Sequence, residues 1–171
     1  MRATLAEKVS IRWAIRRDVP EIMTIESEGV KVEDAFSEGH LLSLFKKRHV
    51  GIVADLDGEV VGYALYAIPF NQSYISLDRL VVHSGYRRVG IGGLLMSWLK
   101  RRLIPVDNVN GNARKQILAG VAEDLLSVQL FLKAQSFDFL WNERESAQSR
   151  DIMGARRDTY WFTYHGDVGG N

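Results

Sequence analysis

The stretch best suited to chemistry lies between positions 80 and 95, where an apolar segment meets a glycine-rich loop and then an amphipathic segment. Arg87 is followed by two residues, Gly90, one residue and Gly92. At the start of a helix, the first backbone N–H groups lack partners and carry about half a positive charge. Glycines remove side chains that would keep an anion away, and Arg87 and Arg88 add two permanent charges. The pattern therefore predicts a pyrophosphate site.

A purely structural explanation of these glycines stays open, because glycines at the start of a helix also permit tight packing or a tight turn. Two other phosphate-binding motifs are excluded. A P-loop requires Gly-Lys-Ser/Thr after its glycines, and a dinucleotide fingerprint requires three glycines in a fixed pattern within a parallel βαβ unit.

The motif Arg87-x-x-Gly90-x-Gly92, with Leu80-x-Val82 before it, resembles the acetyl-CoA-binding motif of the GNAT superfamily of N-acetyltransferases. The expected order of elements agrees with that family over residues 11–164. Within the family the chain looks most similar to the ribosomal-protein alanine N-terminal acetyltransferases. The resemblance implies acetyl-CoA as cosubstrate, no metal, and an acceptor that is a protein N-terminus or a small-molecule amine. Because the chain has no cysteine, the amine is expected to attack the thioester directly, without an acyl-enzyme.

The resemblance also implies where the cosubstrate binds. Backbone groups of the strand before the motif hold the pantetheine arm as an added strand would, and the amides after it hold the pyrophosphate. The family's sheet splays open between this strand and the next, expected at residues 116–121, and the thioester lies in that gap. The implied cosubstrate-binding residues are Leu80, Val81, Val82, Arg87, Arg88, Val89, Gly90, Ile91, Gly92 and Gly93.

The chain departs from the family at the general acid. The family commonly uses a water-linked carboxylate as base and a tyrosine as acid, in a helical pattern ending Leu-Tyr-x-x-x-Gly-Phe. Here Leu132 stands at the tyrosine position, Ser136 at the glycine position and Leu125 where an asparagine is usual. The family's tyrosine, as general acid, therefore has no counterpart at this position of the chain.

Several side chains near the expected gap could supply acid–base chemistry. Asp78 lies on the motif strand, on the side of Leu80 and Val82, while Glu123 and Asp124 follow the other splayed strand. Each also has a structural explanation: Asp78 as the partner of a cation, Glu123 as a solvated group, Asp124 as a helix cap. Tyrosines of the last strand could replace the acid, line the acceptor pocket or simply pack. The predicted catalytic set is Glu123, Asp78 and Tyr164.

The pKa of the acceptor amine matters more than the missing acid. A leaving thiol with a pKa near 8.5 needs little proton assistance at neutral pH. Deprotonating a lysine of pKa about 10.4 at pH 7 costs about 4.6 kcal/mol, against about 1.1 kcal/mol for an α-amino group of pKa about 7.8. We therefore favour an N-terminal or other low-pKa amine.

The elements that must position these residues follow from periodicity and turn signals. Asp18 is expected to cap a first helix with Pro20 in its first turn, and Leu126, Leu130 and Phe131 are expected to face inward. The fold class is α/β (mixed α+β), the GNAT fold: a central, mostly antiparallel sheet of about seven strands, splayed between strands 4 and 5, with helices on both faces. Strands are expected at residues 11–16, 50–55, 59–68, 74–82, 116–121, 137–141 and 159–164, and helices near 18–25, 36–47, 90–103 and 124–134.

Composition bounds the remaining alternatives. The chain has 171 residues, 46% of them hydrophobic, a net charge of +1 and no cysteine, which excludes a disulfide framework and a cysteine nucleophile. We expect a tail at 1–10, one N-acetyltransferase domain at 11–165 and a flexible tail at 166–171. Four histidines without metal-like spacing are expected at the surface. The basic run at residues 100–102 is better explained as a solvated helix end than as a nucleic-acid contact.

No signal peptide or membrane span is visible, so we expect a cytoplasmic protein with no membrane or nucleic-acid partner; a homodimer stays open. The alternative to an enzyme is a non-catalytic module of the same fold that binds CoA or acyl-CoA, and the missing tyrosine keeps it open.

Overall fold

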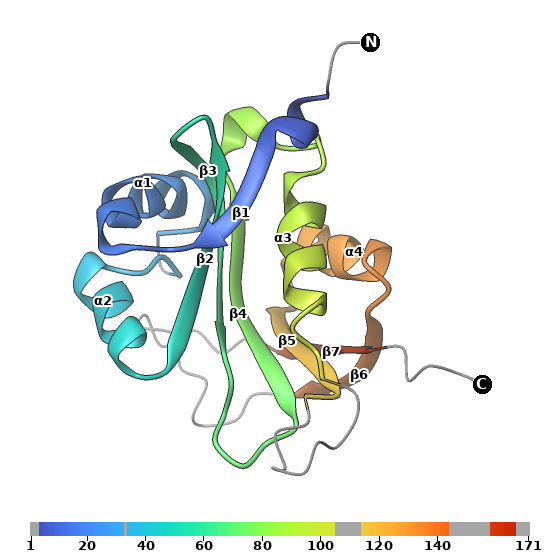
Figure 1. The fold of residues 1–171 in the computed structure, drawn as a ribbon. Helices are drawn as coiled ribbons and strands as arrows, with labels where there is room; N and C mark the ends of the chain where they lie inside the picture. The colour runs from blue at the N-terminus through green and yellow to red at the C-terminus, as the bar shows by residue number, and fades with distance from the viewer. Residues whose placement is uncertain (1–3, 33, 105–113, 144–157, 167–171) are drawn as a thin grey trace. The chain divides into compact units, whose positions relative to one another are not determined.

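The computed structural model describes residues 4–32, 34–104, 114–143 and 158–166. Seven strands form one sheet in the order β1-β2-β3-β4-β5-β7-β6 (Figure 1). Short 3-10 helices precede β1 (η1, Leu5–Lys8), α1 (η2, Arg16–Asp18) and α3 (η3, Ser84–Tyr86). The other elements, in chain order, are β1 (Val9–Trp13), α1 (Val19–Gly29), α2 (Glu38–Lys46), β2 (His49–Leu56), β3 (Glu59–Ala67), β4 (Tyr74–Val82), α3 (Ile91–Lys100), β5 (Gln116–Ala122), α4 (Leu126–Ala134), β6 (Asp138–Glu143) and β7 (Thr159–His165).

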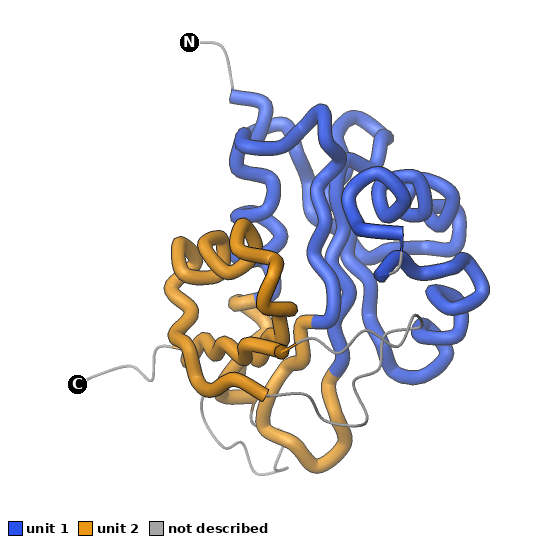
Figure 2. Tube along the Cα trace, turned by 180° about the vertical axis from the view of Figure 1, so that it is seen from behind, with its two compact units in different colours: residues 1–67, 78–99 blue, residues 68–77, 100–171 orange. Residues whose placement is uncertain are grey.

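The chain forms two compact units, which Figure 2 distinguishes by colour. The first contains Met1–Ala67 and Asp78–Leu99, and the second contains Ile68–Leu77 and Lys100–Asn171. The boundary passes through β4, so the two halves of this strand belong to different units. The expected fold class is confirmed: the strands form a mixed, mostly antiparallel sheet in which β4 and β5 pair in parallel.

In the first unit, helices cover both faces of the sheet, with α1 and α2 on one side and α3 on the other (Figure 1). The face under α1 and α2 is a hydrophobic cluster in which side chains from both helices and from β2, β3 and β4 are buried. On the α3 side, Gly62 of β3 allows close approach: a Cβ there would lie 3.4 Å from Ile91 and 3.5 Å from Leu95. The buried side chains of α3 are Ile91, Leu95, Met96, Trp98 and Leu99.

A buried carboxylate lies among these apolar residues. Glu26 of α1 is 1% exposed, accepts a hydrogen bond from the Tyr63 hydroxyl and lies 3.2 Å from the Arg79 guanidinium. Its Oε1 also accepts from the backbone N–H of Phe36 at 2.9 Å, and Arg79 donates to the carbonyl of Asp34 at 2.8 Å. Burial, together with the negative charge of Glu26, raises the pKa of Tyr63, so the hydroxyl remains a donor at neutral pH. The Glu26 network thus joins α1, β3, β4 and the segment before α2.

A second ionic cluster fixes the corner between β1 and α1. Asp18 accepts two hydrogen bonds from Arg12, at 2.7 and 2.9 Å, and a third from the Ile15 N–H at 2.8 Å. The Arg12 Nε donates to Asp55 of β2 at 2.8 Å. Burial would raise the pKa of Asp18, but the hydrogen bonds from Arg12 and Ile15 outweigh it and hold that pKa below its usual value.

In the second unit, β7 pairs antiparallel with both β5 and β6, and the first half of β4 pairs in parallel with β5. Lys100 donates to the carbonyl of Gln135 at 2.5 Å and lies 4.0 Å from the centre of the Tyr164 ring. Burial lowers the pKa of this lysine. The ring of Phe137 lies against Tyr164, with centroids 5.6 Å apart.

Three sequence-based expectations about helices are wrong. Asp18 does not cap α1 through its side chain, because its carboxylate is committed to Arg12 and Ile15. Helix α4 begins at Leu126 after Leu125, so Asp124 is not its cap. Leu126 and Leu130 are exposed, and the buried residue is Leu132, which lies about 200° round the helix from Leu130. Most of the segment between the helix expected near 90–103 and the strand expected at 116–121 falls outside the described residues, as does most of the loop joining the last two strands and of the C-terminal tail.

We expect Glu26→Gln to lower the free energy of unfolding by about 3 kcal/mol, because it leaves the partly buried Arg79 without its counter-charge. Urea denaturation measures the effect. Glu28→Gln, on the same helix but with an exposed carboxylate, is the control and should change stability by less than about 0.5 kcal/mol. Equal losses in the two variants would contradict the role assigned to the Glu26 network.

The depressed pKa of Asp18 gives a pH prediction. A carboxyl whose pKa is lower in the folded state stabilises the fold above its unfolded pKa of about 3.9, and this contribution is lost as the pH falls through the folded value. Asp18→Asn should therefore cost about 2 kcal/mol at pH 7 and progressively less below about pH 4. Thermal or urea unfolding of both proteins between pH 7 and pH 2.5 tests this, and a difference independent of pH would contradict it.

Candidate functional site

The loop between β4 and α3 carries the residues that sequence analysis singled out. The chain leaves β4 at Val82, passes through η3 and reaches α3 at Ile91. Arg88 and Gly90 both have positive φ, at 63° and 96°, so the backbone reverses twice before the helix starts. Residues Arg87 to Gly90 are all exposed, whereas Ile91 is buried and anchors the start of α3.

The backbone N–H groups from Arg87 to Gly93 have no acceptors within the described part of the chain. The N–H of Tyr86 donates to the carbonyl of His83, and the N–H of Leu94 makes the first helical bond, to the carbonyl of Gly90. Between these two residues, from Arg87 to Gly93, no backbone N–H donates to another described residue. Exposed donors at the start of a helix attract an anion, since the helix dipole adds partial positive charge there.

Side-chain contacts hold the loop in place on the first unit. The N–H of His83 donates to the carbonyl of Val61 on β3, and the Tyr86 hydroxyl donates to Glu59 at 3.2 Å. The negative charge of Glu59 raises the pKa of Tyr86. His83 and Ser84 each lie 3.4 Å from the Glu28 carboxylate on α1. The loop is therefore fixed from two elements while its amides stay exposed.

Arg87 and Arg88 differ in their surroundings. The Arg87 Nε donates to the carbonyl of Val82 at 2.9 Å, so this guanidinium braces the end of β4. Arg88 is exposed and makes no ion pair with any described residue. Arg88 is the cation that can reach a bound anion without breaking an existing contact.

The ladder between β4 and β5 ends part-way along β4. The parallel ladder with β5 consists of four residue pairs and ends with Leu77 opposite Ala119. From Asp78 to Val82, no described residue of β5 pairs with β4. Of the residues expected to contact the pantetheine arm, Val81 is buried, whereas Leu80 and Val82 are partly exposed.

Asp78 has a partner that the sequence did not reveal. Its Oδ2 lies 3.0 Å from Nε2 of His49, at the start of β2. The Nδ1 of His49 is buried without a hydrogen-bond partner. Because these residues are 29 positions apart, no local pattern could have identified the Asp78–His49 pair. The expectation of surface histidines holds for His40 and His165, which are exposed, and fails for His49 and His83, which are partly buried and paired.

The other two predicted catalytic residues belong to the second unit. Glu123 follows β5 and is exposed; its backbone N–H donates to Asp158, and its carboxylate makes no hydrogen bond with a described residue. The ring of Tyr164 is flanked by Lys100 and Phe137, contacts that account for this residue by packing alone. Leu132, which the sequence resemblance aligns with a tyrosine, is 2% exposed.

Metal-binding groups and membrane-spanning helices were both sought among the described residues. Among the residues described, no group of three or more His, Asp or Glu side chains is arranged to hold a metal ion. Within the same residues, no helix has the length and apolar character needed to span a membrane.

Comparison with known proteins gives a family match and many similar folds. The sequence model of the acetyltransferase (GNAT) family matches residues 12–114. Comparison with curated proteins gives no match. Among solved structures, the fold is similar to the ribosomal-protein-S18-alanine N-acetyltransferase of Escherichia coli, with a TM-score of 0.72 and 16% identity over 95% of this chain and 97% of that one.

Two further structures are similar to a comparable extent. The ribosomal-protein-alanine N-acetyltransferase of Brucella melitensis has a TM-score of 0.70 and 20% identity, over 91% of this chain and 99% of that one. Ard1 of Thermoplasma volcanium has a TM-score of 0.70 and 16% identity, over 92% of this chain and 97% of that one. These TM-scores establish a common fold, and the order of elements expected from the sequence agrees with it.

The positive φ of Gly90 predicts that its substitution is costly even though space is available. A Cβ at this position would meet only the Ala6 side chain, at 3.7 Å, so the penalty is conformational. Gly90→Ala should lower the free energy of unfolding by about 1–2 kcal/mol. The matched control is Gly39→Ala in α2, where nothing lies within 4 Å and stability should rise by about 0.5–1 kcal/mol. Urea titration of both variants tests the pair, and a neutral Gly90→Ala would contradict the strained loop.

Proposed function

The chain belongs to the acetyltransferase (GNAT) family, and we propose that it transfers an acetyl group from acetyl-CoA to a primary amine. The observation that carries this proposal is the run of backbone amides from Arg87 to Gly93 at the start of α3, none of which donates to another described residue. A run of N–H donors at the start of a helix, together with Arg88, which makes no ion pair with a described residue, suits a diphosphate. Acetyl-CoA supplies a diphosphate together with an activated thioester.

In the proposed complex, the amides of Arg87 to Gly93 hold the diphosphate, with Arg88 as a counter-charge. The free edge of β4 from Leu80 to Val82 offers backbone groups to the pantetheine arm, whose amides need partners of this kind. Arg87 keeps the end of β4 in place through Val82. None of these interactions requires a metal.

The reaction is direct attack of a neutral amine nitrogen on the thioester carbonyl. The new C–N bond forms, the C–S bond breaks, and the amine proton leaves to a base while the thiolate takes up a proton. We propose Asp78 as that base, because it lies on the same strand as the pantetheine contacts and carries its own partner, His49. The exposed Glu123 is the competing candidate, and we assign Tyr164 to packing rather than to proton transfer.

The acceptor is proposed to be an amine of low pKa, such as a protein N-terminus. An α-amino group needs about 3.5 kcal/mol less than a lysine side chain to lose its proton at neutral pH. The similarity in fold to two ribosomal-protein alanine N-acetyltransferases agrees with this class of acceptor.

One observation favours a second function, a module that binds CoA or acyl-CoA without turnover. Leu132 fills the position of the family's tyrosine and is buried, so no hydroxyl is available there. The two functions share the diphosphate site and differ in whether CoA is released in the presence of amines.

Calorimetry with CoA, followed by an assay of free CoA released from acetyl-CoA, tests both parts of the proposal. We expect Arg88→Ala to weaken CoA binding about tenfold, since it removes one charge-assisted contact, and Gly92→Glu to weaken it further by placing a carboxylate beside the phosphates. Arg101→Ala, an exposed arginine after α3, is the control and should leave affinity unchanged. Unchanged CoA affinity in the Gly92→Glu variant would contradict the proposed diphosphate site.

The acceptor panel should contain peptides with free N-termini, N-terminally blocked lysine peptides and small amines. We expect CoA release with free N-termini to exceed that with blocked lysine peptides at pH 7. Tight CoA binding without release across the whole panel would establish the binding module instead. Comparable rates on both classes of peptide would contradict the low-pKa acceptor.

A further inference from the structure

A cavity of about 480 Å³ opens on the first unit where β1 separates from β2. At this point the N–H of Ala14, directly after β1, donates a hydrogen bond to the carbonyl of Gly51 in β2. Beyond it the chain turns into η2, and α2 closes the opposite wall. The volume falls in the range of small-molecule sites, and no residue between Arg87 and Gly93 lines it.

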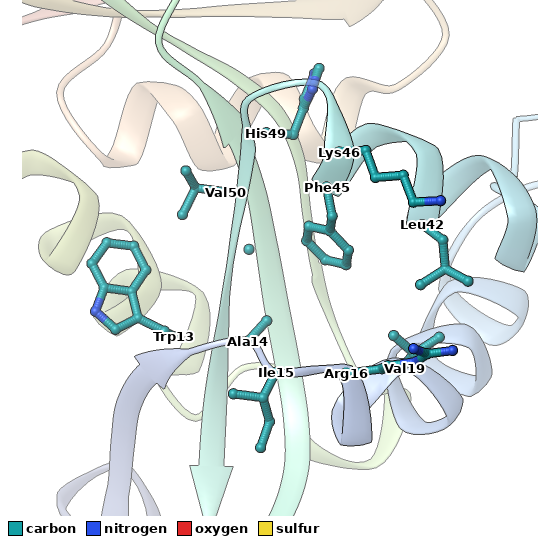
Figure 3. A pocket seen from close by; sticks show the side chains of 11 residues that line it. Trp13, Ala14, Ile15, Arg16, Val19, Leu42, Phe45, Lys46, His49 and Val50 are labelled. Carbon is teal, nitrogen blue, oxygen red and sulfur yellow. The ribbon is translucent and has the colours of Figure 1, made fainter.

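The wall of this cavity is mostly apolar. Ile15 and Trp13 are 53% and 49% exposed, so apolar surface at its mouth contacts water. Figure 3 shows the Phe45 ring between Ala14 and Leu42. The remaining apolar side chains of the lining are those of Val19 and Val50.

The charged side chains of the lining all have the same sign. Arg16 and Lys46 contribute a guanidinium and an ammonium, His49 is the remaining titratable group, and no acidic residue lines the cavity. Neither Arg16 nor Lys46 pairs with a described carboxylate. In Figure 3 their charged ends lie on the same side of the view as Leu42. An apolar wall with two unpaired cations matches a ligand that has an apolar body and one negative charge.

The walls are formed before any ligand binds. The backbone from Ile15 to Asp18 is held by the Ile15 N–H donating to the Asp18 carboxylate and by Arg12 bridging Asp18 and Asp55. On the other wall, a Cβ on Gly51 would lie 2.7 Å from the Phe45 ring, so the ring packs directly on the backbone of β2. A preformed site binds without the entropic cost of ordering its walls.

We propose that this cavity binds a small apolar monocarboxylate, with its chain or ring against Phe45 and Leu42 and its carboxylate between Arg16 and Lys46. A ligand with two or three charges would leave the apolar wall unused, and a cation would meet two like charges. The proposal is independent of the diphosphate site, because the two sets of residues do not overlap.

Calorimetric titration of the full chain with decanoate, below its micelle concentration, tests the proposal, with decylamine as the cationic counterpart. We expect saturable binding of one decanoate and none of decylamine. Arg16→Gln should weaken decanoate binding about fivefold, and Lys46→Glu about tenfold or more while allowing decylamine to bind.

Lys47→Glu is the matched control, since it makes the same change in net charge on the adjacent, exposed residue that does not line the cavity. It should leave decanoate affinity unchanged. Failure of decanoate to bind, or equal losses in Lys46→Glu and Lys47→Glu, would overturn the proposal.

A third arm repeats the titration with CoA present and with the Gly92→Glu variant. Unchanged decanoate affinity in both supports a separate site. Competition between CoA and decanoate would place the decanoate chain in the coenzyme site and would overturn the proposal, whatever the outcome for acetyl transfer.

Discussion

The first unit depends on how a buried negative charge is neutralised. Glu26 lies inside the cluster beneath α1 and α2, where an unpaired carboxylate would be very unfavourable. Its partners come from three other places: Tyr63 on β3, Arg79 on β4 and the backbone of Phe36 before α2. Satisfying one carboxylate therefore fixes the relative positions of α1, two strands and the chain segment that leads into α2. Since Arg79 directly follows Asp78 and precedes Leu80, this also fixes the part of β4 that carries the proposed site.

The proposed site differs from the buried Glu26 network in how its polar groups are bonded. Beneath the sheet the polar groups of Glu26 and Tyr63 are bonded, whereas the amides from Arg87 to Gly93 are bonded to no described residue. Exposed amides cost little in this state because water satisfies them, and an incoming phosphate exchanges water for a stronger, charge-assisted partner. Arg88 and Gly90 in this loop have positive φ, and contacts with Glu28 and Glu59 hold the loop in place.

The sequence predicts those parts of the fold that rest on local pattern. The bounds of β4 are predicted correctly, since an apolar, β-branched run ends at a glycine-rich turn, and α3 starts one residue from its expected position. Contacts between distant residues are a different matter. Asp18 precedes a helix as a cap would, but its carboxylate is taken by Arg12, and Asp78 is bound by His49 from another strand. In α4 the apolar residues lie on more than one face. Periodicity therefore predicted that Leu126 and Leu130 face inward, whereas the buried residue is Leu132.

In the proposed mechanism, a leucine at position 132, where the resemblance aligns a tyrosine, changes what the site must do more than whether it can act. A thiol with a pKa near 8.5 leaves as a thiolate with modest help, so solvent can supply the proton that a tyrosine would give. The amine is the larger barrier, and its deprotonation needs a base close to the thioester. Asp78 follows the last residue of β4 that pairs with β5, and its carboxylate lies 3.0 Å from Nε2 of His49. Because a carboxylate is a weak base toward a lysine ammonium but a less mismatched one toward an α-ammonium, the proposed mechanism suits N-terminal acceptors best. Leu132 offers no hydroxyl for proton transfer, and this limit on acid–base catalysis is what makes an acceptor of low pKa the proposed choice.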